Sequence, residues 1–179
     1  MLLAWGQKVD NEFAYTVMRY VSQLGWEPDM ANDLMSCMAF ETGETFSPTI
    51  RNAAGSGAIG LIQFMPSTAV GLGTTTEQLS KMTAVAQLYY VWKYFRPYAG
   101  KIRNIDDMYM AILMPRYIDA PPDKKIFISN TIAYRQNAGL DNNKDGYITK
   151  SEITLKLRTK LSKGMTLRFC RRIPDIAIA

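Results

Sequence analysis

Apolar residues recur at three- and four-residue spacing along most of the chain, which is the pattern of amphipathic helices. Strict alternation of apolar and polar residues, which is typical of half-buried strands, is scarce. The pattern predicts helices over residues 8–24, 29–41, 66–71, 77–98, 105–113, 124–138 and 150–163. We therefore expect a mainly α fold, with one domain in residues 1–163 and a loose basic tail in residues 164–179.

The helix predicted over 29–41 ends in a carboxylate. Leu34, Met38 and Glu41 lie at i, i+4 and i+7, so Glu41 shares the stripe of the apolar residues. A carboxyl group held among apolar residues has a raised pKa, because the charged form loses its hydration. Such a group is suited to act as a general acid. The alternative is a solvated helix end, since Gly43 follows closely and glycine commonly ends helices.

The composition narrows the chemistry. The 179 residues include no histidine, which excludes Ser-His, Cys-His and His-metal sites. Cys37 and Cys170 lie in unlike contexts, and neither a disulfide framework nor a zinc site follows from them. Carboxylates, tyrosines and lysines are left as acids and bases. The aromatic residues of the segment 89–95 are explained by core packing or, alternatively, by a stacking platform for sugar rings.

The ends of the chain bear on where it acts. The first ten residues lack the basic start and apolar stretch of a signal peptide, and no run approaches the roughly 18 apolar residues of a membrane span. We expect synthesis in the cytoplasm without a signal peptide. The net charge of +5 is concentrated in the last quarter of the chain. This basic segment is either a solvated surface or a contact for an anionic envelope, and no motif favours nucleic acid.

A 12-residue loop over 141–152 matches the EF-hand calcium-binding pattern. Glycine stands at its sixth position, and Ile148 is the usual apolar residue at the eighth. The expected calcium ligands are Asp141, Asn143, Asp145, the carbonyl of Tyr147, and Glu152. A metal-free turn is the alternative. Because regulatory EF-hands usually come in pairs, a single loop favours a structural calcium ion over a sensor.

Three motifs resemble the lytic transglycosylase and goose-type lysozyme family, particularly its phage-encoded members. Glu41-Thr42 stands where the family has its catalytic glutamate followed by serine, and residues 55–69 are similar to its glycine-rich Gly-Leu-Met-Gln stretch and the following helix. Ala133-Tyr134 with Asn137-Ala138-Gly139 resembles its Ala-Tyr-Asn-Ala-Gly element, although two residues separate Tyr134 from Asn137. The resemblance covers residues 28–140 and implies a lysozyme-like catalytic domain.

The resemblance implies cleavage of the β-1,4 bond between N-acetylmuramic acid and N-acetylglucosamine in peptidoglycan, with Glu41 as general acid and base. It also implies that Thr42, Gly60, Gln63, Tyr134 and Asn137 contact the substrate or the acid. The bacterial cell wall would be the site of action, reached without a signal peptide, as by a phage endolysin.

The second step of the reaction stays open at this stage. A hydrolase needs a second carboxylate to position water, whereas a transglycosylase uses the muramic 6-hydroxyl and releases a 1,6-anhydro product. Glu44 is the nearest second carboxylate, and a solvated loop charge is its alternative interpretation. Asp106 and Asp107 fit a helix start better. The lack of a compelling second acid favours the anhydro product.

A rival function is a calcium-organised module of lysozyme-like fold that binds glycan or a partner protein without cutting. A third is disruption of the envelope by the basic C-terminal segment. We expect a monomer whose partners are peptidoglycan strands, with no nucleic acid.

Overall fold

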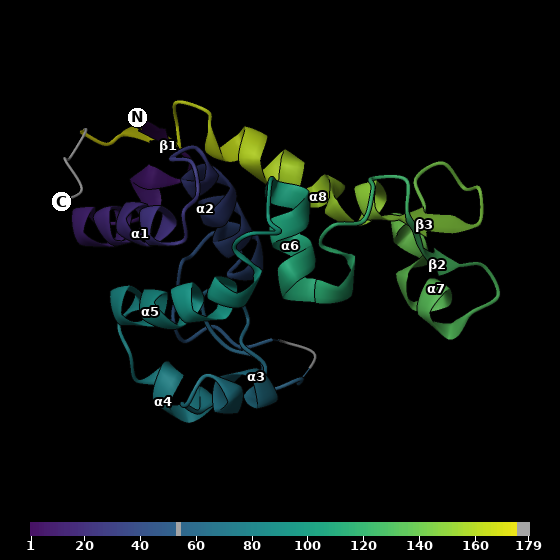
Figure 1. The fold of residues 1–179 in the computed structure, drawn as a ribbon, viewed down its shortest axis with the longest axis horizontal. Coiled ribbons are helices and arrows are strands. Elements are labelled where there is room, and N and C mark those ends of the chain that lie inside the picture. The colour runs from purple at the N-terminus through teal and green to yellow at the C-terminus, as the bar shows by residue number, and fades with distance from the viewer. Residues whose placement is uncertain (53–54, 175–179) are drawn as a thin grey trace.

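The computed structural model describes residues 1–52 and 55–174 and is mainly helical (Figure 1). The helices in this part of the chain are α1 (Asn11–Gln23), α2 (Met30–Glu41), α3 (Pro66–Gly71), α4 (Thr76–Ser80), α5 (Ala84–Phe95), α6 (Ile105–Leu113), α7 (Ile132–Asn137) and α8 (Lys150–Gly164). The strands are β1 (Leu2–Leu3), β2 (Lys125–Ile128), β3 (Tyr147–Thr149) and β4 (Arg171–Arg172). The predicted mainly α fold is confirmed.

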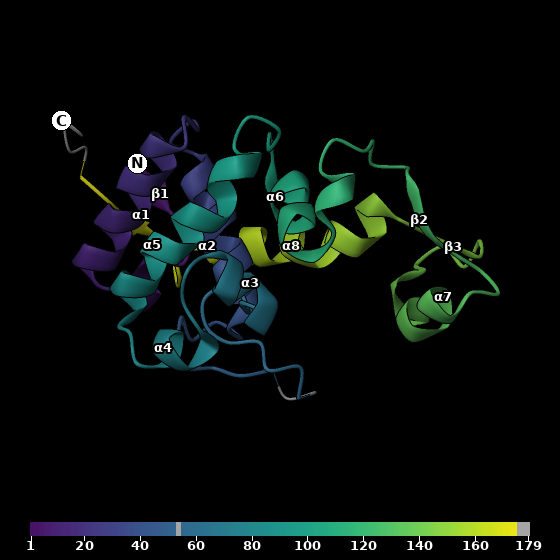
Figure 2. The same cartoon turned by 60° about the horizontal axis from the view of Figure 1, so that its bottom comes forward.

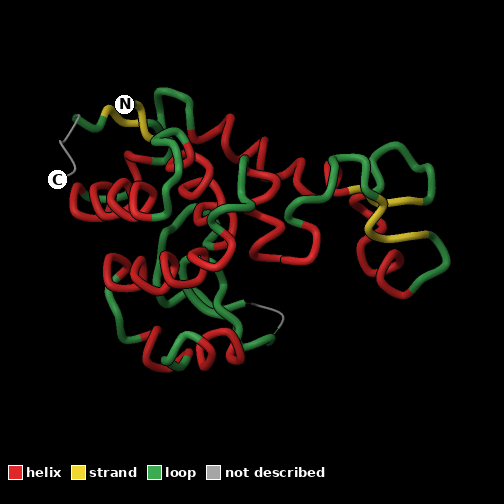
Figure 3. The backbone as a smooth tube through the Cα atoms, in the orientation of Figure 1, coloured by secondary structure: helices red, strands yellow, loops and turns green. Residues whose placement is uncertain are grey.

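The helices form two unequal parts, which the tube in Figure 3 separates clearly. A helical body contains α1 to α6, and α8 runs along it (Figures 1 and 2). At the far end of α8, β2, α7 and β3 form a small projection, here called the distal lobe (residues 125–149). Within the described residues, α8 packs most extensively on α2 and α6, so this helix joins the two parts.

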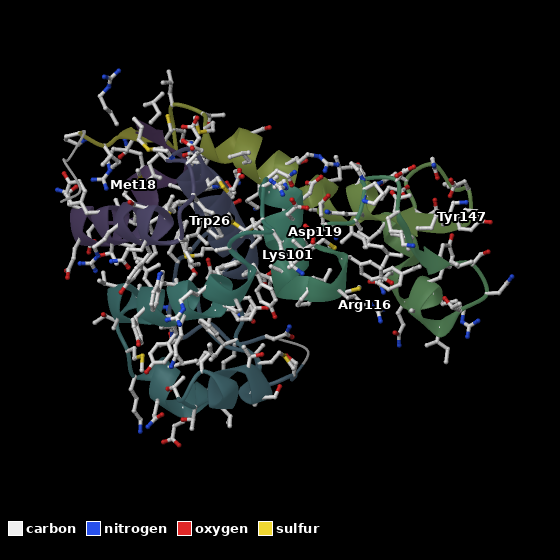
Figure 4. The ribbon with its side chains drawn as sticks, viewed as in Figure 1. Met18, Trp26, Lys101, Arg116, Asp119 and Tyr147 are labelled. Atoms are coloured by element: carbon white, nitrogen blue, oxygen red, sulfur yellow. The ribbon has the colours of Figure 1, made fainter. Side chains whose placement is uncertain are left out.

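The core of the helical body is built around α2. Leu34, Met35 and Met38 are at most 2% exposed, and the small residues of this helix are also buried. Trp26, labelled in Figure 4, precedes α2, packs edge to face on Phe95, and donates a hydrogen bond from Nε1 to the Ala99 carbonyl (3.0 Å). Helix α2 is therefore buried on nearly all sides, and its C-terminal end is where the chain leaves the core.

The single helix predicted over 77–98 is divided in the structure. Helix α4 ends at Ser80, and α5 begins after Thr83, whose side chain accepts a hydrogen bond from the backbone N–H of Ala86. A threonine that caps a helix stops the preceding helix from continuing through it. The apolar spacing runs on across this break, so periodicity alone does not reveal it.

The helix predicted over 124–138 begins as a strand. β2 pairs in antiparallel fashion with β3, with Phe127 opposite Ile148. Only the later residues, in α7, are helical. A short apolar run takes the strand form when a partner strand is present, and β3 is supplied by the loop over 141–152. The tail also differs from the prediction: up to residue 174 it is anchored, because β4 pairs with β1 and Ile173 is buried. Residues 175–179 lie outside the described part.

Candidate active site and calcium loop

Glu41 is the last residue of α2, where the predicted helix also ends. Burial raises the pKa of its carboxyl group from the usual 4.5 to about 7. Within residues 1–52 and 55–174, no group donates a hydrogen bond to this carboxylate and no cation pairs with it. The shift therefore comes from lost hydration without compensation, and it leaves a carboxyl group that is largely protonated below neutral pH.

Tyr109 of α6 is the tyrosine that interacts electrostatically with Glu41. Its ring packs edge to face on Phe40, at a centroid distance of 5.5 Å. Burial raises the pKa of its phenol, and the negative charge of Glu41 raises it further. Sequence reasoning missed Tyr109, because it stands within the apolar run from Met108 to Ala111 and looks like an ordinary core residue. The sequence alone carries no signal that would distinguish Tyr109 from its apolar neighbours, because its relation to Glu41 depends on the packing of α6 on α2.

Thr42 is completely buried and holds the chain as it leaves α2. Its hydroxyl donates to the Met38 carbonyl (2.7 Å) and accepts from the Phe46 N–H (3.0 Å). These two bonds use the hydroxyl to set the direction of the segment after Glu41. The structure thus gives Thr42 a positioning role beside the acid, and no described contact turns it towards a substrate.

Glu44 forms ion pairs with two lysines of α8. Its carboxylate accepts from Lys160 Nζ (2.6 Å) and from Lys163 Nζ (2.6 and 2.8 Å). These hydrogen bonds lower the pKa of Glu44, the opposite of the shift at Glu41. Its backbone has a φ of 69°, so this turn is fixed in the left-handed region. The ion pairs join Glu44 to α8, and its predicted use as a second carboxylate stays a prediction.

The glycine-rich turn is tied to the body by Gln87 of α5, which is completely buried. Gln87 Oε1 accepts from the Leu61 N–H (3.1 Å), and its Nε2 donates to the carbonyls of Pro48 (2.7 Å) and Leu79 (2.8 Å). Gly60 has a φ of +77°, and a Cβ there would lie 2.3 Å from Gln87 Oε1. Glycine is therefore required at position 60, and sequence reasoning missed the glutamine that requires it.

Gln63 closes the same turn. Its φ is 52°, and its side-chain Nε2 donates to the carbonyls of Ile50 (3.2 Å) and Gly60 (3.1 Å). The amide N–H groups are thus used within the turn. Its side chain remains partly exposed. The predicted substrate contact stays a prediction, in which the carbonyl oxygen of the amide is the available group.

A second, partly buried carboxylate lies on the same helix, and sequence reasoning missed it as well. The pKa of Asp33 is raised to about 7 by burial first, and then by the negative charges of Asp106 and Asp29. Asp106 is itself bound by Arg158 of α8, at 2.6 and 2.7 Å. Asp33 therefore faces an acidic neighbour at the junction of α2, α6 and α8, whereas Glu41 lies at the end of its helix.

Tyr134 and Asn137 are not brought to Glu41. Both lie on α7 in the distal lobe, which Figures 1 and 2 show far from α2. The Tyr134 hydroxyl donates to Asp141 Oδ2 (2.5 Å), and Asn137 Nδ2 donates to the Ala133 carbonyl (2.9 Å). These contacts serve the lobe itself. Tyr109, not Tyr134, is the tyrosine whose pKa responds to the charge of Glu41.

The loop over 141–152 carries oxygen-bearing side chains in its first half. Asp141 is 8% exposed, and it accepts hydrogen bonds from the N–H groups of Asp145 (3.3 Å) and Gly146 (3.0 Å). Asn143 Oδ1 also accepts from the Asp145 N–H (3.1 Å). Gly146 has a φ of +84°, as the sharp turn at the sixth position demands. This all-oxygen donor set fits a hard cation such as Ca²⁺.

Glu152 connects the two ends of the loop. Its Oε1 accepts from the Asn142 N–H (3.1 Å), and its Oε2 accepts from the Thr149 N–H (2.9 Å) and hydroxyl (2.8 Å). The latter contacts form a capping box at the start of α8. In the part of the chain that the structure describes, no three acidic or cysteine side chains gather closely enough to hold a metal. Bidentate binding by Glu152 requires its carboxylate to turn away from Thr149.

The loop is joined to the helical body by a buried ion pair. Lys150 Nζ donates to Asp107 Oδ1 (2.5 Å) and to the carbonyls of Ile118 (2.6 Å) and Ala120 (2.9 Å). The side chains of Lys150 and Asp107 are 3% and 8% exposed. Asp107 belongs to the first turn of α6, the helix that carries Tyr109. The start of α8 and the tyrosine beside Glu41 are therefore fixed to the same helix.

No protein-family model, curated protein or solved structure matches this chain. None of the helices in residues 1–52 and 55–174 has the length and apolar character that crossing a bilayer requires.

Proposed function

We propose that this protein cleaves the glycan strands of peptidoglycan at the β-1,4 bond that follows N-acetylmuramic acid. The observation that supports this proposal most strongly is the raised pKa of Glu41, about 7, at a helix end without a compensating partner. In the proposed reaction, protonated Glu41 donates its proton to the glycosidic oxygen as the bond to the muramic C1 breaks and positive charge develops on that sugar.

The product of the second step is proposed to be the 1,6-anhydro sugar. A hydrolase of the inverting type needs a second carboxylate about 6.5–9.5 Å from the acid. Glu44 is paired with two lysines. Asp33 precedes Glu41 by eight positions, which corresponds to about 12 Å along a helix axis. These observations on Glu44 and Asp33 support a step in which ionised Glu41 takes the proton of the muramic 6-hydroxyl, whose oxygen then attacks C1.

Tyr109 is proposed as a positioning residue in this reaction. Its raised pKa keeps the phenol protonated at neutral pH, so it remains a hydrogen-bond donor. A donor beside the carboxylate helps to stabilise the ionised form of Glu41 that appears after the first proton transfer. Its own partner before substrate binds is not among the hydrogen bonds of the described residues.

The test compares three isosteric amides along α2 and its exit: Asp33→Asn, Glu41→Gln and Glu44→Gln. Digestion of purified murein is expected to fall by about a thousandfold in Glu41→Gln alone, since general acid catalysis contributes about 10²–10⁴. Circular dichroism checks that each variant folds. Equal activity of Glu41→Gln and the parent contradicts the proposal. Binding of the parent to murein without release of fragments supports the non-catalytic module instead.

Mass spectrometry of the released muropeptides separates the two products. Anhydro ends are expected, and they are one water lighter than the reducing ends that a hydrolase leaves. If the parent releases reducing ends and Glu41→Gln does not, the result supports glycosidase activity through Glu41 but contradicts the anhydro step. In that case, a fall in activity of Asp33→Asn or Glu44→Gln identifies the missing base.

We also propose that the loop over 141–152 binds one structural calcium ion. The supporting observation is the set of oxygen-bearing side chains described above, in which Asp141 and Asn143 both accept a hydrogen bond from the backbone N–H of Asp145. The carbonyl of Tyr147 and the carboxylate of Glu152 would complete the set. The ion would neutralise the loop's carboxylates and fix the distal lobe on α8. It has no part in the cleavage step.

A further inference from the structure

The turn that follows α8 holds two apolar side chains in solvent. Leu167 is 91% exposed, more than any other large hydrophobic side chain in the described residues, and Met165 is 38% exposed. In Figure 1 this turn stands at the edge of the helical body near the N-terminus, at the end away from the distal lobe. Residues 165–169 are called the apolar turn below.

The backbone of the apolar turn is fixed. The Thr166 carbonyl accepts from the N–H groups of Phe169 and Cys170 (both 2.9 Å), and the Phe169 carbonyl accepts from the Gln7 N–H (2.9 Å). The Met165 N–H donates to the last turn of α8. These bonds hold the turn against the helical body. Leu167 is therefore exposed on an ordered turn, and because a single exposed apolar residue is common on protein surfaces, the charges around it decide what it can bind.

Cations surround the base of the apolar turn. Lys8, Lys163 and Arg168 lie over the ring of Phe169, at 5.9, 5.2 and 5.4 Å from its centroid. Lys163 is paired with Glu44, so its charge is offset. Among the described residues, Lys8 and Arg168 have no ion-pair partner, and both side chains are exposed. Two positive charges therefore stand at the Phe169 ring, in the same turn as the exposed leucine.

We propose that the apolar turn docks this protein on an anionic phospholipid surface. Leu167 and Met165 enter the boundary between headgroups and acyl chains, while Lys8 and Arg168 contact the lipid phosphates. Apolar side chains flanked by cations are the combination that binds such an interface. Nucleic acid or an acidic polymer would satisfy the cations, but neither gives Leu167 an apolar phase. This docking is independent of the proposed glycosidase activity and uses none of its residues.

The test is co-sedimentation of the full chain with lipid vesicles. Binding is expected to vesicles of phosphatidylglycerol and phosphatidylethanolamine, and not to vesicles of phosphatidylcholine alone. Leu167→Ser is expected to weaken partition about tenfold, because a partly inserted leucine loses its apolar contact. Arg168→Gln is expected to weaken it about fivefold, and salt should weaken it further.

Ile132→Ser is the matched control, since Ile132 is 66% exposed on α7 in the distal lobe. Its partition should equal that of the parent. Absence of binding to the anionic vesicles overturns the proposal. Binding that Leu167→Ser leaves unchanged also overturns it and shows adsorption by charge alone, which equal retention on duplex DNA would confirm. Murein digestion by Leu167→Ser, measured in parallel, is expected to match the parent, so the two proposals fail or stand separately.

Discussion

The end of α2 and the loop over 141–152 both depend on carboxylates, but they surround them in opposite ways. Glu41 receives no hydrogen bond from the described residues, and burial raises its pKa to about 7. Asp141 accepts from Tyr134 and from the backbone of its loop, and these bonds lower its pKa. The first environment favours a neutral acid that can give up a proton. The second favours a permanent charge that can hold a cation.

The comparison also separates two ways in which a fold positions a carboxylate. The loop arranges its groups by local hydrogen bonds within twelve consecutive residues. The acid at the end of α2 depends on packing between distant helices, among them α6, whose Tyr109 packs on Phe40. A change in the loop should therefore act locally, whereas a change at a helix junction should be felt by the whole body.

The largest stability effect is expected at the junction of the two regions. Lys150→Met leaves Asp107 buried without its cation, and removal of one partner from a buried pair costs about 3–5 kcal/mol. Urea unfolding measures the loss. Lys101→Met is the control, because its 4.0 Å pair with Asp119 is 64% and 59% exposed and visible beside α6 in Figure 4. The control should lose less than about 1 kcal/mol. Equal losses would mean that Lys150 does not join the regions.

The next effect is a pH dependence of opposite sign at two neighbouring glutamates. The raised pKa of Glu41 means that the folded state holds its proton more tightly than the unfolded state. Ionised Glu41 therefore costs stability, and this cost grows as the pH rises from about 4.5 to about 7 and is constant above. At about pH 8, Glu41→Gln should be more stable than the parent by about 2 kcal/mol, with little difference at about pH 4.

Glu44 gives the contrast to this result. Its pKa is lowered by Lys160 and Lys163, so its ionised form stabilises the fold, and this contribution is lost as the pH falls through the lowered pKa. Glu44→Gln should be less stable than the parent near neutral pH, by less than about 1 kcal/mol. Stability curves from denaturant unfolding at several pH values check both signs. A destabilised Glu41→Gln at high pH would show that its carboxylate has an unseen partner.

The sequence predicted what depends on consecutive residues. It predicted α2 with Glu41 at its end, and the sharp turn at Gly146 in the loop over 141–152. Calcium binding by this loop stays a prediction. Sequence reasoning missed β2, because a run such as Lys125 to Ile128 becomes a strand only when β3 is beside it. It also missed the break before α5, where Thr83 interrupts an apolar spacing that continues on both sides.

The site residues that it missed share a dependence on distant contacts. Tyr109 is an apolar-flanked core residue in the sequence, and only the packing of α6 on α2 relates it to Glu41. Gln87 looks like a polar residue on an amphipathic helix, yet it is 0% exposed and holds the glycine-rich turn. The predicted place of Tyr134 beside Glu41 was wrong for the same reason. The similarity of a short motif does not reveal in which part of the fold its helix lies, and α7 lies in the distal lobe.

An effect comparable to that of Glu41→Gln is expected where the body holds the glycine-rich turn. Gly60→Ala places a Cβ 2.3 Å from Gln87 Oε1 at a φ of +77°, so the turn or the glutamine must move. Strain of this kind costs about 2 kcal/mol. Gly71→Ala is the control, because nothing lies within 4 Å of a Cβ there. Thermal unfolding of both variants measures the difference. A Gly60→Ala variant as stable as its control would show that Gln87 does not constrain the turn.

The last prediction tests calcium binding by the loop over 141–152 and its independence from the acid. Calcium at about ten times its dissociation constant should stabilise the fold by about 1.4 kcal/mol, because only the folded loop binds it. For a chain of this size, the melting temperature should rise by about 3–5 °C relative to chelator. Glu152→Gln should remove this difference, and Asp119→Asn, which lies outside the loop, should keep it.

Murein digestion by Glu152→Gln at 25 °C should stay within about twofold of the parent, because the loop organises the distal lobe and contributes nothing to the proton transfer at Glu41. Identical melting temperatures of the parent in calcium and in chelator would contradict calcium binding. A large loss of digestion in Glu152→Gln would mean that α8 transmits the state of the loop to Tyr109.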